Sequence, residues 1–426
     1  MDNEQDFGLK EAIVIASFVW LLSYFIHAPT AFGGTWIYSD ITGLLATRGI
    51  IYADRLLIPY IDYHFEYPPI VALLFILSNL AILVIPISMI SLRWLIAYTV
   101  MSILLFLHAI GTVYLLFKLS KYTDKKPIRI LLCFILAPSF LIFSNYNWDL
   151  VGIFYGLLGL YFFLENKRLL SFVSFGLAMA GKIIPGIIAL APVAQIFVEY
   201  IEKEKAKNNH LVPKKYLFAI FHSFKYLIVT ATVFMVANLP FIILNFEAWY
   251  SGLILHHAGW YIEDSWLILI FSAGSPYAKI VSIALSICFT VITFLLLISK
   301  NIQKEQRIFY GSAAFMSGYL FSNYVYTPQM NLMLLPLLIF VPIEYVIIFV
   351  FDALNALIIL TWFSFKNIYS LFHIDIDNPI HPLSIPQIAA SIRCFLLLAI
   401  LFMIYLEIID AEKISKKGSS HNRKHQ

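Results

Sequence analysis

Charged side chains are scarce in this 426-residue chain. Lysine, arginine, aspartate and glutamate make up only 13% of the residues, whereas hydrophobic residues make up 61% and the mean hydropathy is +0.84. Soluble globular proteins carry roughly twice that share of charge, because a polar surface must cover their apolar core. The shortage argues against a cytosolic enzyme, a nucleic-acid-binding protein and a disordered scaffold, and it predicts that much of the surface faces lipid.

Cysteine is also rare. Cys133, Cys288 and Cys394 lie in separate apolar segments, so the sequence has neither a disulfide framework nor the paired spacing of a zinc site. The first residues lack the basic start and the small-residue cleavage site of a signal peptide. We therefore expect the apolar stretch 11–28 to be retained as a membrane anchor.

Apolar stretches alternate with polar connections along the whole chain, which we treat as one integral membrane domain, 1–426. Membrane-spanning helices need about 20 apolar residues, and several stretches approach that length. The stretches cover residues 11–28, 69–90, 94–117, 130–144, 150–164, 169–181, 185–199, 217–243, 277–298, 308–321, 330–342, 344–362 and 387–408.

Basic residues between these stretches set the predicted orientation. The positive-inside rule places all of their clusters on the cytoplasmic side. This holds only if 69–90, which has prolines near both ends, does not cross the membrane and lies at the outer face. The sequence then predicts an all-α protein with about twelve crossings, a long first outer loop at 29–93 and a basic cytoplasmic tail at 409–426. The clusters fall within residues 118–129, 167–168, 203–215, 300–307 and 413–424.

Three polar strings fall on the predicted outer side, and each allows a structural and a functional interpretation. Asp40 is either a loop carboxylate or helix cap, or a functional acid. Glu66 and Tyr67, followed by two prolines, form either an interfacial turn or a rigid polar corner. Asn147 and Asp149 flank a tryptophan, and they either cap the next helix or present polar groups and a ring to a sugar.

Three further features lie at the same predicted face. Lys182 stands between two short apolar segments, and it either snorkels to the interface or forms an anion site at a broken helix. His256 and His257 point in different directions on a helix, so a two-histidine metal site is not expected. One of them could donate a hydrogen bond to a phosphate or hydroxyl. Gln329 lies in a turn that enters the next helix.

Taken together, these strings resemble the GT-C superfamily of membrane glycosyltransferases. The resemblance is nearest to the polyprenyl-phosphate-mannose-dependent enzymes, which include glycosyltransferase family 87 and the catalytic subunit of GPI mannosyltransferase I. One departure is that Asp40 has no acidic neighbour, which leaves metal dependence open; we expect no metal and no cofactor. The resemblance also implies juxtamembrane helices in the first outer loop. The motifs are Asp40, Phe65–Pro69, Asn147–Asp149, Gly181–Pro185 and Thr327–Gln329.

The resemblance implies inverting transfer of a hexose, with mannose as first choice, at the outer face. The donor is a polyprenyl- or dolichyl-phosphate sugar and the acceptor a lipid-linked sugar or glycolipid; membrane lipids are further partners, and nucleic acid is not. Asp40 would be the general base. Lys182 and one of His256 and His257 would contact the departing phosphate, with Arg48 or Arg55 as helpers. The remaining predicted substrate-binding residues are Glu66, Tyr67, Asn147, Asp149 and Gln329.

Two other functions remain open. A secondary transporter of the major-facilitator type would also have twelve crossings, although such proteins have short outer loops and repeat symmetry. A non-catalytic subunit of a glycosylation complex is the third possibility. The expected location is the cell membrane, or the endoplasmic reticulum in a eukaryote.

Overall fold

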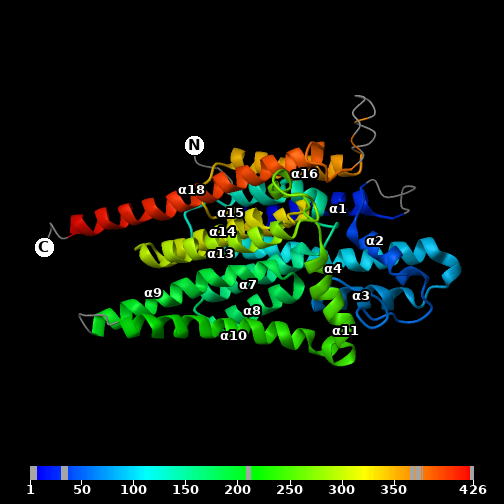
Figure 1. Cartoon of the computed structure of the whole chain (residues 1–426), viewed down its shortest axis with the longest axis horizontal. Coiled ribbons are helices and arrows are strands. Elements are labelled where there is room, and N and C mark those ends of the chain that lie inside the picture. Colours follow the sequence, from blue (N-terminus) through cyan, green and yellow to red (C-terminus); the bar gives the residue numbers. More distant parts are fainter. Residues whose placement is uncertain are drawn as a thin grey trace.

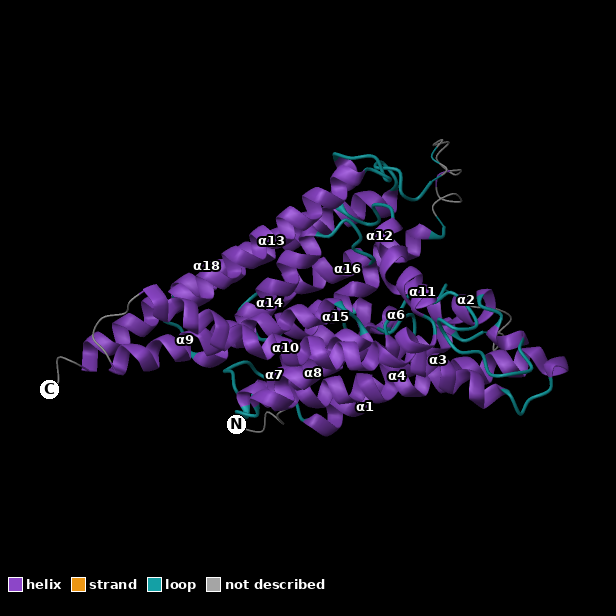
Figure 2. Cartoon of the chain, turned by 60° about the horizontal axis from the view of Figure 1, so that its bottom comes forward, coloured by secondary structure: helices purple, strands orange, loops and turns teal. Residues whose placement is uncertain are grey.

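The computed structural model describes residues 7–29, 37–207, 213–364, 369, 376 and 378–422, with side chains described as far as 411. Helices account for the regular structure of these residues, and there is no strand among them (Figure 2). The prediction of an all-α protein is confirmed. The distal part of the predicted tail 409–426 lies outside the described residues, as do residues 365–368, 370–375 and 377.

Seven helical segments of the described chain are long and apolar enough to cross a membrane. They are α1 (Leu9–His27), η2 with α4 (Ile87–Ser120), η4 with α9 (Ile184–Lys207), α10 (Pro213–Leu244), α13 (Pro276–Ser299), α16 (Tyr345–Trp362) and the first part of α18 (Ile385–Ala411). The other α-helices are shorter or less apolar: α2 (Asp40–Thr47), α3 (Pro69–Ile82), α5 (Ile128–Ile130), α6 (Pro138–Phe143), α7 (Asp149–Leu164), α8 (Arg168–Gly181), α11 (Phe246–Trp249), α12 (His256–Gly259), α14 (Lys304–Ser322) and α15 (Asn331–Leu338).

The outer helices have the inverted polarity that lipid requires. On α13 the buried residues include Ala278, Ser282 and Thr293, whereas Ile280 and Ile283 are more than half exposed. Small and hydroxyl-bearing residues let helices approach closely inside a membrane, and large apolar residues face the acyl chains. A continuous apolar surface of this kind is unfavourable in water. The chain is therefore a multi-pass membrane protein.

The basic connections gather at one end of the bundle. Figure 1 shows the joined ends of α9 and α10 and the C-terminus at the left, and α2, α3 and α11 at the right. Basic residues and their neighbours therefore meet on one side, as the charge pattern predicted. Three side-chain contacts join these connections: Tyr122 with Glu165, Lys304 with Asn166, and Arg168 with Glu199.

The last turn of helix α3 lies beyond the end of α1 that is away from the basic connections. The Tyr98 hydroxyl of α4 donates to the backbone oxygen of Tyr24, near the end of α1, at 2.9 Å. Helix α4 starts at Ile90, about two turns before Tyr98. In its first turn, Arg93 donates to the Ile85 backbone oxygen at 3.3 Å. Since a helix rises 1.5 Å per residue, the end of α3 lies past the end of α1. With 14 residues, α3 is also shorter than an upright span needs.

Candidate functional site

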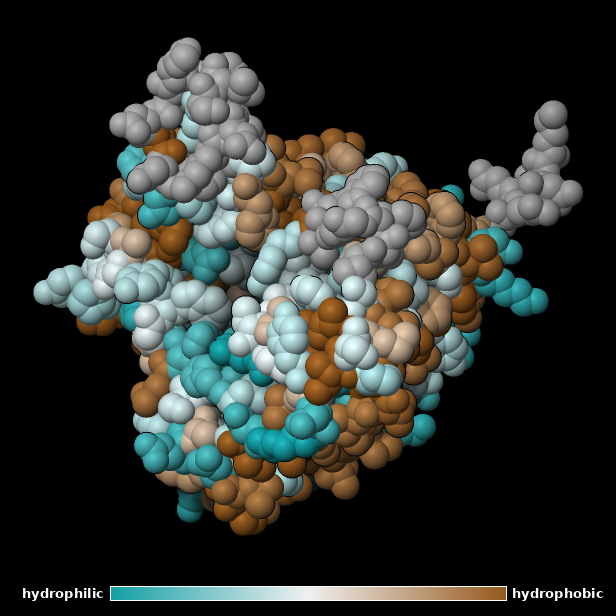
Figure 3. All heavy atoms as spheres, turned by 90° about the vertical axis from the view of Figure 1, so that its right-hand side faces the viewer, coloured by the Kyte–Doolittle hydropathy of each residue, from teal (hydrophilic) through white to brown (hydrophobic). Residues whose placement is uncertain are grey.

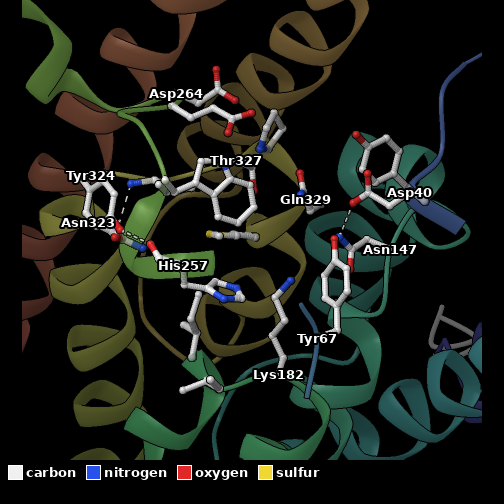
Figure 4. A pocket seen from close by; sticks show the side chains of 18 of the residues that line it. Asp40, Tyr67, Asn147, Lys182, His257, Asp264, Asn323, Tyr324, Thr327 and Gln329 are labelled. Carbon is white, nitrogen blue, oxygen red and sulfur yellow. Dashed lines mark hydrogen bonds between the residues drawn. The ribbon is translucent and has the colours of Figure 1, made fainter. Parts of the chain in front are cut away.

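A cavity of about 620 Å³ opens at the end of the bundle opposite the basic connections. Its walls come from segments that are far apart in sequence, including α2, the end of α8, η5 (Tyr250–Leu255) with α12, and the turns before α7 and α15 (Figure 4). Viewed from this end, the surface shows polar side chains gathered across it and hydrophobic side chains along its flanks (Figure 3). Six of the nine predicted site residues line the cavity: Asp40, Tyr67, Asn147, Lys182, His257 and Gln329.

Asp40 begins α2 with its carboxylate directed at the cavity rather than at the helix backbone. Ser39 is the N-cap, because its hydroxyl accepts from the Ile41 N–H at 3.2 Å. The interpretation of Asp40 as a helix cap is therefore wrong. The Asn147 amide donates to the Asp40 carboxylate at 2.7 Å, which fixes its orientation (Figure 4).

The surroundings of Asp40 make it a stronger base. Burial in the cavity wall raises the pKa of Asp40 to about 7, while the Lys182 charge and the Asn147 hydrogen bond oppose the increase. The nearby acids Asp149 and Glu263 raise the pKa further. A carboxylate with a pKa near the working pH is suited to take a proton from a hydroxyl.

Lys182 directly follows α8 and directs its ammonium group into the cavity instead of toward the surface (Figure 4). Its nitrogen lies 2.8 Å from the Asp149 carboxylate at the start of α7. Helix α7 can come this close because residue 152 is glycine; a Cβ there would lie 2.7 Å from the Lys182 Cβ. Within the described chain, the fully buried Asp149 carboxylate has no hydrogen-bond donor besides this ammonium group.

Two acids on the facing wall were not among the predicted site residues. Glu263 and Asp264 line the cavity. The Glu263 backbone N–H donates to the Tyr324 backbone oxygen at 3.0 Å, in a short bridge between two turns. Arg393, buried in α18, holds this wall by donating to the Asp264 backbone oxygen at 2.6 Å. The sequence did contain a signal, since adjacent acids in an aromatic outer segment are costly to bury.

Burial raises the pKa of Glu263 and of Asp264, and the mutual repulsion of these carboxylates raises that of Asp264 further. Arg393 opposes this increase. The cavity therefore has acids on two sides, and the Lys182 ammonium group points into it from a third side (Figure 4).

His257 is a neutral imidazole in this site. Burial, the Lys182 charge and His256 lower the pKa of His257 to about 4. Its Nδ1 lies 3.1 Å from the Leu253 backbone oxygen, which can only accept, so Nδ1 carries the proton and Nε2 is an acceptor. This corrects the prediction of a donor to phosphate: the exposed nitrogen suits a hydroxyl group.

Three predicted residues do not line the cavity. The Glu66 carboxylate accepts from the Arg48 guanidinium at 2.9 and 3.0 Å, so neither residue is directed at a substrate. His256 faces His64, with ring nitrogens 3.4 Å apart. The Asp149 carboxylate lies 2.8 Å from the Lys182 nitrogen. Arg55 is also absent from the cavity lining, and it forms an ion pair with Asp62 at 2.9 Å. Substrate contact by these residues stays a prediction.

The chain matches no protein-family model, and no curated protein matches it. Among the described residues, no group of three or more histidine, cysteine, aspartate or glutamate side chains is placed to hold a metal ion.

Proposed function

We propose that this chain is a membrane glycosyltransferase. It would move a hexose, with mannose as first choice, from a polyprenyl- or dolichyl-phosphate sugar to a hydroxyl of a glycolipid or lipid-linked acceptor. The observation that carries the proposal is that Asp40 and Lys182 line one cavity at the end of the bundle away from the basic connections. The transfer needs both a base and a cation, and neither is common at such a site.

Asp40 acts as the general base. As the acceptor hydroxyl attacks the anomeric carbon, its proton passes to the Asp40 carboxylate, the new glycosidic bond forms and the bond to the phosphate oxygen breaks. A direct displacement of this kind inverts the anomeric configuration. Asn147 holds the carboxylate in place, and its hydrogen bond at 2.7 Å favours the charged form that accepts the proton.

Lys182 stabilises the charge that develops on the lipid phosphate as it leaves. An ammonium group has three N–H donors, so Lys182 can keep its contact with Asp149 and still donate to a phosphate oxygen. The buried Asp149 thereby acts as a positioning residue that holds the ammonium group at the cavity wall.

The rest of the lining suits an amphipathic donor. Ile358 and Ile359 of α16 and the following Phe363 give one wall an apolar surface on which an isoprenoid chain can pack. Trp260 and Tyr324 supply rings of the kind that stack on sugars. Gln329 is a polar group available to sugar hydroxyls.

We also propose the twelve-crossing topology, with α3 as a juxtamembrane helix. The short helices α7 and α8 pack against each other, and α7 also contacts α4 and α15. Helices enclosed by others need less apolar length on their own, because neighbouring helices cover them. The membrane would be the cell membrane or the endoplasmic reticulum.

The test uses the purified full-length protein with radiolabelled dolichyl-phosphate mannose, dolichyl-phosphate glucose in parallel, and membrane lipids as acceptors. Labelled glycolipid should form with the wild type and not with Asp40→Asn, which should still bind donor. The control Asp62→Asn removes an acid on the same outer loop that is outside the cavity, and it should transfer sugar normally. Near-normal turnover by Asp40→Asn would remove Asp40 as the base.

A further inference from the structure

A second groove, of about 910 Å³, lies at the end of the bundle that carries the basic connections. It runs between the end of α9, the start of α10 and the end of α13, and it shares no lining residue with the Asp40 cavity. It is open at the side of the bundle, where Leu295 of α13 is 55% exposed. The glycosyl-transfer proposal gives this groove no role.

The polar rim of the groove is predominantly positive. Lys205 of α9, Lys300 at the end of α13 and Arg307 of α14 line it, and Glu202 is the single acid among the described lining residues. Arg307 is buried and donates to the backbone oxygens of Leu297 and Lys300, both at 3.0 Å. These bonds fix the end of α13 and hold a positive charge at the inner edge of the groove.

The floor of the groove is apolar. It is formed by Val198 and Ile201 of α9 and by Ile292, Leu295 and Leu296 of α13. A soluble anion would leave this floor uncovered, and a lipid with a neutral head would gain nothing from the excess of basic over acidic residues at the rim. An anionic head with attached acyl chains matches both parts.

We infer that this groove binds an anionic phospholipid of the leaflet that faces the basic connections. Basic pockets between helices on the cytoplasmic side are suited to anionic head groups, and each nearby lysine contributes about 1 kcal/mol to the attraction. The acyl chains lie over the α13 floor, and the phosphate lies between Lys205 and Lys300.

Native mass spectrometry of the full-length protein, titrated with phosphatidylglycerol or phosphatidylcholine in detergent, tests the inference. The wild type should retain phosphatidylglycerol in preference to phosphatidylcholine. Lys205→Gln should weaken phosphatidylglycerol binding about fivefold, the ratio that corresponds to one lysine, and leave phosphatidylcholine binding unchanged. The matched control Lys203→Gln removes an exposed charge from the same helix outside the groove, and it should bind as the wild type does.

A second pair of variants tests the floor. Leu295→Trp fills the groove and should reduce phosphatidylglycerol retention, whereas Ile287→Trp, at a 59% exposed position on the same helix, should not. Equal losses in Lys205→Gln and Lys203→Gln would mean general surface attraction and overturn the site. Unchanged binding in Leu295→Trp would do the same, as would displacement of the lipid by excess soluble glycerol phosphate.

Discussion

Replacing Asp40 by asparagine should stabilise the folded protein above neutral pH while it removes the proposed transfer. Burial raises the pKa of Asp40 from 3.8 to about 7, so the folded protein holds this proton more tightly than the unfolded chain does. The proton-linked stability is fully present below pH 3.8 and is lost as the pH rises through 7. At higher pH the fold encloses a carboxylate, and asparagine relieves that cost.

The size of the effect follows from the pKa difference. About three pKa units at 1.36 kcal/mol each set an upper limit of about 4 kcal/mol at pH 8. Asp40 is only partly buried by its side chain's accessible surface, and solvent at the open side screens part of this cost. We therefore expect a gain of about 1–3 kcal/mol. An asparagine oxygen can still accept from Asn147, so little packing is lost.

Equilibrium unfolding in mixed micelles, at about pH 8 and about pH 4, measures the effect. The variant should be more stable than the wild type at the higher pH, and the advantage should shrink at the lower pH. Asp62→Asn is the control of opposite sign: burial raises the pKa of Asp62, but hydrogen bonds from Ile58 and Arg55 outweigh this and lower it. Its replacement should destabilise the protein at the higher pH. If Asp40→Asn is destabilising there as well, Asp40 is stabilised as a carboxylate and the reasoning fails.

Three further predictions concern the supports of the cavity. Lys182→Met should destabilise the fold by about 3–5 kcal/mol, because Asp149 is left as a buried unpaired charge. Unfolding assays should show that adding Asp149→Asn restores the stability. Donor binding should stay lost in the single and in the double variant. Asn147→Leu should shift the acidic limb of the kcat/KM profile to higher pH, because it removes a hydrogen bond that lowers the pKa of Asp40; an unmoved limb would disconnect the two residues. Arg393→Met should lower transfer with a raised donor KM, because Arg393 holds the wall that carries Asp264. An unchanged donor KM would show that this wall takes no part in binding the donor.

Much of the helical framework could be predicted from apolar run length and the placement of lysine and arginine, because lipid imposes both. The site was harder. Ser39 and Asp40 are both good helix caps, and the sequence alone does not show which one the helix uses. Glu66 has the residue type of a site acid, but the conformation of the outer loop brings Arg48 to it as an ion-pair partner. Such pairings depend on tertiary contacts that no local pattern records.

The short helices show a second limit of sequence reasoning. Helix α8 has 14 residues and is followed directly by Lys182, so length alone gives no reason to place its end beside Asp40. Gly152 decides the geometry, because only a residue without a side chain lets α7 approach this lysine. The sequence showed a lone cation between two broken segments; the structure adds the buried acid that holds it.

The charges of the cavity lead to one more prediction, because its described lining includes three acids and one lysine, and that lysine already contacts Asp149. An anionic donor would be repelled if Asp40, Glu263 and Asp264 were all ionised. Burial raises the pKa of both wall acids, so this coupled pair can hold a proton when the phosphate enters. Donor binding should then weaken at high pH as the pair ionises, whereas transfer needs Asp40 deprotonated.

The expected kcat/KM profile is bell-shaped, with its acidic limb near pH 7 from Asp40 and its alkaline limb from the pair. Asp264→Asn should abolish the alkaline limb or move it to higher pH, and it should leave the acidic limb almost in place. This result would distinguish the contribution of the wall acids from that of Asp40. Steady-state rates across the pH range, with donor affinity measured in parallel, provide the check. An alkaline limb that persists unchanged in Asp264→Asn would show that the wall acids have no part in admitting the phosphate.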